Sequence, residues 1–440
     1  MPDPLPRDTS DTTDLQPMPV LRDTRFLRVK LDMVAKCQLK CIMCHFAHPE
    51  FKSMDDVMEG ELLEKVAAEV FPRSHDVVLS SSAEPLMARS LPRALELCRQ
   101  YGVPWFHFST NLMSMTHKLM EKIVAVQMPL MTVSVDGATK ATFEKIRPPA
   151  KWEQFLARFD LVNEVKRATG SKTPQLSATA VLMRSNIEEM PDLVRLMRSK
   201  GVDYMNFVHM ALIGGLGIED ETMLKYPALC NRMMAEVQVV ANEVGMQVQL
   251  PLPLQEEIVA DARDNNPLRA QEGAGNALQA PTEHASSATV AEYLNHKNRE
   301  FNFKVPARDH HSRLCYFPWY YIHINPDGTV FPCGCWFEFS SFGSFATQSF
   351  KEIWTGPAYR KLRHEHLTAQ FRDVCANCSV AVMGRPDVTA SFSHRAKIKR
   401  EKLTPVMWFS GRPMRWSLQM LVSSLMRSVP KTGSFLNWPL

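Results

Sequence analysis

The sequence has few of the features that would place a protein in a membrane or outside the cell. No uninterrupted apolar run in its 440 residues approaches the roughly 20 that a membrane-spanning helix needs, which excludes a membrane-spanning chain. Residues 1–25 lack a basic patch followed by an apolar run, so they predict a disordered leader and not a signal peptide. We therefore expect a cytoplasmic protein.

An excess of charge of one sign is also missing. The formal net charge of +4 is too small to indicate nucleic-acid binding, and no recognition module is apparent, so no nucleic-acid partner is expected. Hydrophobic residues at 45% and charged residues at 22% are typical of a globular chain. The length suits one large domain and a smaller one.

Residues 26–252 alternate short β-rich runs with amphipathic stretches such as 58–71 and 187–199, a pattern typical of βα units that build a parallel sheet. Six such units predict an α/β fold, a partial (β/α)6 barrel similar to an incomplete TIM barrel. We expect its strands at residues 27–32, 76–80, 105–108, 130–135, 176–182 and 204–209.

A smaller unit is predicted after a polar stretch. Residues 253–310 are rich in Ala, Asn and Glu, which indicates a linker or surface insertion. In the predicted domain 311–384, the segment 320–331 indicates a β-hairpin around the turn Asn325-Pro326-Asp327-Gly328. We expect a small α+β domain there, followed by a separate tail.

Residues 385–440 form that tail, which is basic and rich in tryptophan. Between residues 394 and 440 a single acid, Glu401, faces nine basic residues: Arg395, Lys397, Lys399, Arg400, Lys402, Arg412, Arg415, Arg427 and Lys431. An apolar stripe at helical spacing over 418–429 is typical of a helix that lies on an anionic membrane surface. A helix packed on the barrel with a solvated basic face explains the same pattern and is favoured over peripheral membrane contact.

The ten cysteines are not spread evenly. Eight of them fall into two groups, which in a reducing compartment favours metal ligation over disulfides. The other two, Cys98 and Cys230, lie in helix-like apolar patterns and are predicted to be buried core thiols.

The first group is Cys37, Cys41 and Cys44, directly after the first predicted strand. The carboxyl ends of barrel strands are where such folds place their chemistry, so the three thiolates are expected on one loop at the barrel mouth. Three thiolates can hold three irons of a cubane cluster and leave the fourth iron open for another ligand.

The run KCQLKCIMCH at residues 36–45 resembles the CxxxCxxC signature of the radical S-adenosylmethionine (SAM) superfamily. The resemblance continues after the next three predicted strands, in Ser82-Ala83-Glu84-Pro85, in Ser109-Thr110-Asn111, and in Ser134-Val135-Asp136-Gly137 with residues 143–147. In Ser82-Ala83-Glu84-Pro85 the chain retains the family's Glu, and Ser82 and Ala83 replace the family's glycines.

Membership of that family implies a [4Fe-4S] cluster whose open iron binds SAM. The reduced cluster cleaves SAM to a 5′-deoxyadenosyl radical, which removes a hydrogen from the substrate. By resemblance, Met43 packs near the adenine, where the family usually has an aromatic residue, and Glu84 meets the methionyl amino group. Asn111, Ser134 and Asp136 complete the expected SAM contacts, and a flavodoxin- or ferredoxin-like protein is the expected electron donor.

The second group is Cys315, Cys333, Cys335, Cys375 and Cys378. Its surroundings, including residues 353–356 and 359–363, resemble the SPASM/Twitch extension of radical SAM enzymes. The resemblance implies an auxiliary [4Fe-4S] cluster on Cys315, Cys333, Cys375 and Cys378, with Cys335 as a substitute ligand. Since no cysteine follows Cys378, the Twitch form with one auxiliary cluster fits better than the form with two.

Structural zinc is the alternative reading of both groups. In the first group His45 or His48 would be the fourth ligand, and in the second the cysteines alone would suffice. On that reading the chain is a zinc-stabilised binding protein without catalysis.

The reaction follows less directly from the residues. The stretch before Cys37 is too short for an N-terminal peptide-recognition domain, which favours a small hydroxylated, sugar-like or lipid-linked substrate. By its cysteine pattern the chain resembles radical SAM aminocyclitol dehydrogenases, which implies an oxidoreductase whose auxiliary cluster accepts an electron. A peptide- or protein-modifying enzyme is the alternative. His107, His209 and Arg184 could supply a base, and none is assigned.

Overall fold

The computed structural model describes residues 25–49, 51, 56–80, 83–211, 213, 215–254, 315–334, 341–372 and 375. The predicted tail, nearly all of the predicted leader and linker, and Cys335 and Cys378 lie outside these residues. None of the described helices is long and apolar enough to cross a membrane.

A sheet of nine strands forms the centre of the described structure, in the order β7-β6-β5-β4-β3-β2-β1-β8-β9. Neighbouring strands are parallel from β7 to β8, and β9 is antiparallel to β8. The strands are β1 (Leu27–Leu31), β2 (Ser74–Leu79), β3 (Trp105–Thr110), β4 (Leu130–Ser134), β5 (Gln175–Leu182), β6 (Tyr204–His209), β7 (Gln247–Gln249), β8 (Tyr321–Ile324) and β9 (Val330–Phe331). The predicted α/β partial barrel is confirmed, and its sheet is larger than the six expected strands.

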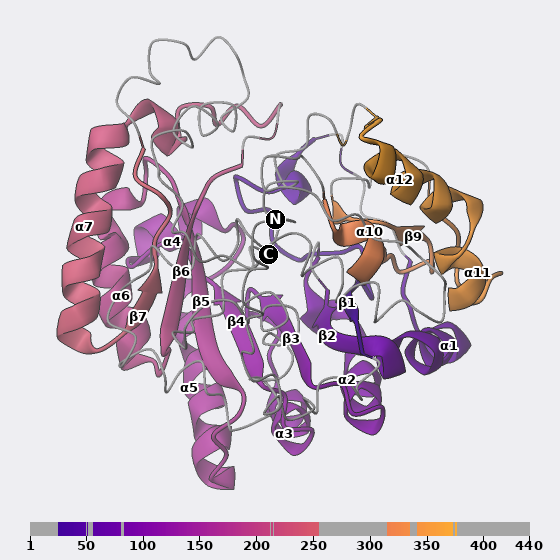
Figure 1. Cartoon of the computed structure of the whole chain (residues 1–440). Helices are drawn as coiled ribbons and strands as arrows, with labels where there is room; N and C mark the ends of the chain where they lie inside the picture. The colour runs from indigo at the N-terminus through magenta and orange to yellow at the C-terminus, as the bar shows by residue number, and fades with distance from the viewer. Residues whose placement is uncertain are drawn as a thin grey trace, which may run out of the picture.

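Helices connect the parallel strands and lie along the outside of the arc that the sheet forms (Figure 1). They are α1 (Gly60–Val70), α2 (Leu91–Gln100), α3 (His117–Ala125), α4 (Lys140–Ile146), α5 (Trp152–Thr169), α6 (Met190–Ser199) and α7 (Pro227–Val244). Gly170 and Gly245 end α5 and α7 with φ of 63° and 67°, a left-handed conformation that glycine adopts without steric cost.

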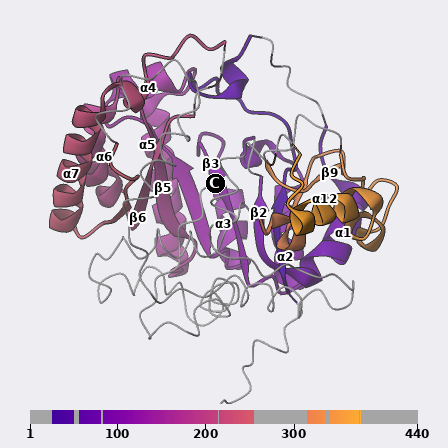
Figure 2. The ribbon, with the colours of Figure 1, turned by 45° about the horizontal axis from the view of Figure 1, so that its top comes forward.

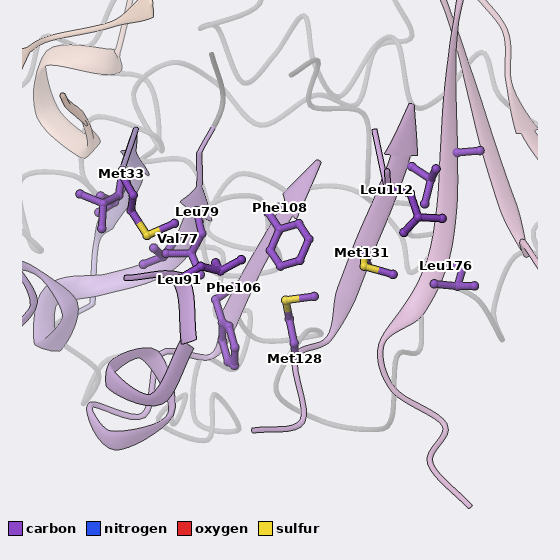
Figure 3. Packing of buried hydrophobic residues seen from close by; sticks show 14 of the residues in the cluster. Met33, Val77, Leu79, Leu91, Phe106, Phe108, Leu112, Met128, Met131 and Leu176 are labelled. Atoms are coloured by element: carbon purple, nitrogen blue, oxygen red, sulfur yellow. The ribbon is translucent and has the colours of Figure 1, made fainter. Parts of the chain in front are cut away.

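The outer face of the sheet is apolar and forms the core with these helices. Alternate strand residues point to this side, because side chains alternate between the two faces of a strand. Figure 3 shows part of this core, with Val77, Leu79, Phe106, Phe108, Met131 and Leu176 from the strands and Leu91 from α2. Cys98 and Cys230 are buried in it, as predicted.

The segment 315–372 extends the same sheet at its β1 end, opposite α7 (Figures 1 and 2). It contains α10 (Phe317–Tyr320), the predicted hairpin as β8 and β9, α11 (Phe350–Trp354) and α12 (Pro357–Thr368). Ser349 begins α11 with a capping box that it forms with Glu352. Lys65 of α1 donates to the carbonyls of Phe345 and Gln348, at 2.7 and 3.0 Å, which ties the segment to the barrel.

Candidate iron-sulfur and SAM site

The loop with Cys37, Cys41 and Cys44 follows β1 directly, so the three thiols lie at the carboxyl edge of the parallel sheet. Each is a half-buried free thiol. Burial raises the pKa of Cys37 to about 12 and the pKa of Cys41 to about 11, because an isolated thiolate is costly in a desolvated site. Bound metal reverses that preference, since a coordinating thiol is deprotonated outright.

Cys37 is held by the loop after β3. The Asn111 side-chain amide donates to Cys37 Sγ at 3.6 Å, and the Leu39 backbone N–H donates to the same sulfur at 3.4 Å. Asn111 and Gln38 also exchange hydrogen bonds of 3.0 and 3.3 Å. Asn111, expected to contact SAM, therefore has a described role in fixing the cysteine loop.

Cys41 is held by the end of α4. The N–H groups of Lys40 and Ile42, on either side of it, donate to the carbonyls of Pro148 and Ile146 at 2.7 and 3.0 Å. This pairing sets Arg147 opposite Cys41, and Arg147 Nη1 lies 3.8 Å from Cys41 Sγ. The guanidinium lowers the pKa of Cys41 against the larger, opposing effect of burial.

Glu84 lies in the loop after β2, and it joins three loops at the barrel mouth. Its backbone N–H donates to the Lys36 carbonyl at 2.9 Å. Its carboxylate accepts from the Thr110 hydroxyl at 2.5 Å, from Asn111 N–H at 2.8 Å and from Leu86 N–H at 3.2 Å. Burial raises the pKa of Glu84 to about 7, although these hydrogen bonds oppose the shift.

Asp136, after β4, is fully buried. Its carboxylate accepts from Val181 N–H at 2.8 Å and lies 2.5 Å from Arg147 Nη2. The Asn186 side chain donates to the carbonyls of Asp136 and Val181, both at 2.9 Å. Ser134, at the end of β4, is half-buried beside them. The expected contact of Asp136 with SAM stays a prediction, and its described role is to hold Arg147.

Met43 lies in a separate apolar cluster at the barrel mouth. The buried residues of this cluster are Ile146, Met183 and Met210. Met43 packs against them from the partly buried rim, as do Ile42, Val181 and Ile218. Val181 lies near the end of β5, Met183 follows β5, and Met210 follows β6. The expected contact of Met43 with the adenine of SAM stays a prediction.

Buried aromatic side chains lie near the cysteines of the second group. Cys315 precedes α10, Cys333 follows β9 and Cys375 lies beyond α12, and all three are half-buried free thiols. The nearby Tyr320 and Tyr359 have raised pKa values because they are buried, and the neighbouring thiols add to this effect.

The buried guanidinium of Arg363 packs against two aromatic rings of the SPASM region. Arg363 is centred 4.5 Å from the Trp354 ring and 4.8 Å from the Tyr359 ring. It donates to the Pro318 carbonyl at 2.9 Å and to the Trp354 carbonyl at 2.6 Å. Burial lowers its pKa to about 9. The second site therefore joins a cation to aromatic faces, next to the thiols.

Two family profiles match the chain. Residues 32–197 match the radical SAM superfamily, and residues 315–379 match the SPASM iron-sulfur cluster-binding domain. The chain carries a radical SAM domain and a SPASM domain. The predicted family is confirmed, and with it SAM and [4Fe-4S] clusters as the cofactors.

Relatives of known activity are distant. A GTP 3′,8-cyclase of Marinobacter nauticus is 25% identical over 205 residues, which cover 46% of this chain and 58% of the cyclase. The AdoMet-dependent heme synthase of Methanosarcina barkeri is 24% identical over 363 residues, which cover 79% of this chain and 89% of the synthase. The structure of Streptococcus suis SuiB bound to S-adenosylmethionine matches with a TM-score of 0.54 at 12% identity, over 83% of this chain and 76% of SuiB, which shows a shared fold.

The cysteines of the radical SAM domain fit a cluster. Soft thiolates are the ligands of such clusters, and N–H groups that point at sulfur are among the features that set cluster potentials. Cys37 and Cys41 both receive such donors. Among the described residues, no group of three Cys, His, Asp or Glu side chains is arranged as ligands of one metal ion.

The inner face of the radical SAM domain is polar, in contrast to its outer face. Strand register pairs Arg28 with Asp76, and His107 lies two residues along β3 from Trp105, the β3 partner of Asp76. Arg28 Nε is 3.1 Å and His107 Nε2 is 3.5 Å from the Asp76 carboxylate. Burial alone would raise the pKa of Asp76, but these two partners lower it. Thr132 and Ser177 share a hydrogen bond of 2.8 Å further along the same face.

The SPASM domain contributes to this inner face. The Nε2 atom of His323, on β8, lies 2.7 Å from the carboxylate of Asp32, which follows β1. Both side chains are buried. The Nδ1 atoms of His323 and His107 are buried and have no hydrogen-bond partner among the described residues. Buried polar atoms of this kind normally bind water or a ligand.

Arg147 and Asn186 make side-chain contacts at the site that sequence reasoning did not single out. Arg147 ends a stretch that the motif comparison covered, and its position between Ile146 and two prolines was the available signal. Asn186 lies in a polar turn after β5 that matched no expected motif. Their roles depend on contacts with distant residues, so local patterns could not reveal them.

Proposed function

We propose that this radical SAM enzyme oxidises a polar, hydroxylated small molecule. The observation that carries the proposal is the polar inner face of the barrel, which begins beside the cysteine loop and continues onto β8 of the SPASM domain. Paired charges and unsatisfied imidazole atoms on this face suit a substrate rich in hydroxyl groups. A sugar-like or lipid-linked molecule has that chemistry.

The chain's own residues position the cofactors. Cys37, Cys41 and Cys44 would hold the SAM-binding cluster, and Met43 would pack on the adenine. When bound, this cluster and SAM supply the 5′-deoxyadenosyl radical, and an auxiliary cluster supplies an acceptor for one electron. Glu84 and Asn111 hold the cysteine loop against the loops after β2 and β3.

The SPASM residues would serve the electron acceptor. Cys315, Cys333, Cys375 and Cys378 would ligate the auxiliary cluster, with Cys335 as a substitute. Tyr359, which interacts electrostatically with Cys333, is fully buried, and Arg363 packs on its ring and on the ring of Trp354. A flavodoxin- or ferredoxin-like protein would deliver the electron that starts the reaction.

A reaction on a tetrapyrrole is the second candidate. The observation in its favour is that the heme synthase of Methanosarcina barkeri matches most of both chains. The charge-paired inner face favours the hydroxylated substrate over a large, mainly apolar macrocycle. Peptide modification is a third possibility that the same experiment addresses.

The decisive experiment is an anaerobic purification with iron and sulfide counts, followed by an assay for 5′-deoxyadenosine from SAM and dithionite. We expect about eight irons in the parent and about four after replacing Cys37, Cys41 and Cys44 by alanine, with loss of SAM cleavage. Cys230→Ala, a buried thiol outside both sites, is the matched control and should keep the full count.

Substrate class is then tested with cyclitols and sugars, with tetrapyrroles and with peptides. Stimulated 5′-deoxyadenosine release and a two-electron-oxidised product from the first group would support the proposal. Turnover of a tetrapyrrole or a peptide alone would replace it by the corresponding alternative. Zinc in place of iron, with SAM left intact, would establish the non-catalytic binding protein.

A further inference from the structure

Arg147 brings a fixed positive charge to the cysteine loop. It follows α4, and the backbone pairing of residues 146–148 with residues 40–42 leaves it little freedom to move. Its Nη1 atom lies 3.8 Å from Cys41 Sγ, across 106 positions of sequence. Arg147 is 6% exposed, so water screens its charge little.

Asp136 balances this charge from the other side. Its carboxylate lies 2.5 Å from Arg147 Nη2, and the residue is 0% exposed. The N–H of Val181 fixes the other carboxylate oxygen at 2.8 Å. Arg147 is thus shared between a carboxylate and a cysteine sulfur, with a different nitrogen turned to each.

We propose that the Arg147–Asp136 pair sets the reduction potential of the cluster on Cys37, Cys41 and Cys44. The proposal rests on the proposed function, because it needs a cluster on those three cysteines. Reduction adds a negative charge to a cluster. A cation beside a ligating sulfur stabilises the reduced form, and an anion behind the cation weakens that effect.

Arg147 therefore raises the potential, and Asp136 limits the rise. Glu84 is another acidic group near the cysteines, and its electrostatic effect falls on Cys37. Removal of Arg147 and removal of Asp136 should shift the potential in opposite directions. A purely structural role for the pair would instead give iron loss or misfolding in both variants.

The test is a redox titration, followed by electron paramagnetic resonance, of the full chain with both clusters loaded and without SAM. The auxiliary signal is subtracted with the spectrum of the variant that lacks the three cysteines. At the parent midpoint we expect the ratio of reduced to oxidised cluster to fall about tenfold in Arg147→Met, a shift of about 59 mV for one electron. Asp136→Asn should raise the ratio, and the double variant should lie between the two.

Arg147→Lys keeps the positive charge, so its reduction potential should stay closer to that of the parent than the potential of Arg147→Met does. The lysine variant also serves as a control if the methionine variant loads iron poorly. Shifts of the same sign in the two single variants, or unchanged potentials at full iron content, would overturn the inference alone. A parent protein that binds no iron on these cysteines would instead overturn the proposed function.

Discussion

The two cysteine sites differ in what surrounds their sulfur atoms, although each has a buried arginine. In the radical SAM domain, Arg147 is paired with a carboxylate, and two amide groups, from the loops after β1 and β3, donate to Cys37 Sγ. In the SPASM domain, Arg363 is stacked on two aromatic rings and held by backbone carbonyls. The cysteines of the first site therefore have polar and charged neighbours, whereas a neighbour of Cys333 in the second site is the aromatic ring of Tyr359.

The largest expected effect separates the two sites by function. Cys41→Ala should reduce 5′-deoxyadenosine formation from SAM to the background of dithionite alone, because it removes a ligand of the SAM-binding cluster. Cys333→Ala should retain SAM cleavage and lose product, because the electron acceptor is impaired. Chromatography of both products from the same reactions measures the difference. Equal loss of SAM cleavage in the two variants would remove the functional contrast.

The next largest effect concerns the pair of Asp32 and His323, which joins the radical SAM domain to the SPASM domain. Asp32→Asn leaves the His323 imidazole without its buried carboxylate, and removing one partner of a buried pair costs about 3 kcal/mol or more. Urea unfolding measures the change, and His323→Gln completes the comparison from the other side. We expect one transition, since β8 shares the sheet with β1. Two separate transitions would show that the regions unfold independently.

The first site should respond to pH through Glu84. Its pKa rises from 4.5 to about 7 on folding, so the folded chain binds this proton more tightly than the unfolded chain does. Its contribution to stability is therefore full below pH 4.5 and falls as pH rises to 7, by about 3 kcal/mol.

Urea titrations of the metal-free protein between pH 4.5 and 7.5 measure this effect. Glu84→Gln should become more stable relative to the parent as the pH rises, because the glutamine does not ionise. Glu188→Gln, at an exposed carboxylate, serves as the control. A constant stability difference between parent and Glu84→Gln would contradict the raised pKa.

The smallest effects sharpen the description of the aromatic site. Arg363→Met removes hydrogen bonds to two buried carbonyls and the contact with two rings, at an expected cost of about 2 kcal/mol. Tyr359→Phe should change stability by less than about 0.5 kcal/mol, because the hydroxyl has no hydrogen-bond partner among the described residues. Thermal unfolding of both variants measures the contrast, and a larger loss from Tyr359→Phe would point to a partner for that hydroxyl.

The sequence predicted the six barrel strands closely. The predicted strand 204–209 coincides with β6, and the others differ from the structure by a few residues at most. Such strands are readable because alternation and helical spacing are local patterns. β7 was missed because it has three residues, too few to show a pattern. The predicted hairpin is present, but nothing local showed that β8 would pair with β1.

The candidate site could be predicted only in part. The cysteines, Glu84, Asn111 and Asp136 were found by spacing and order, and they do gather at the carboxyl edge of the sheet. Their expected contacts with SAM stay predictions. The contacts that the structure does show, such as Asn111 with Gln38 and Asp136 with Arg147, join separate loops.

The sequence by itself determined the family, the cofactors and the alternation of strands and helices, because these follow from residue types at short, fixed spacings. Only the tertiary structure decided that β8 extends the barrel sheet, that the inner face is lined with paired charges, and that Arg147 reaches Cys41. These features depend on which distant segments become neighbours. That choice is made by packing over the whole chain, so no local pattern encodes it.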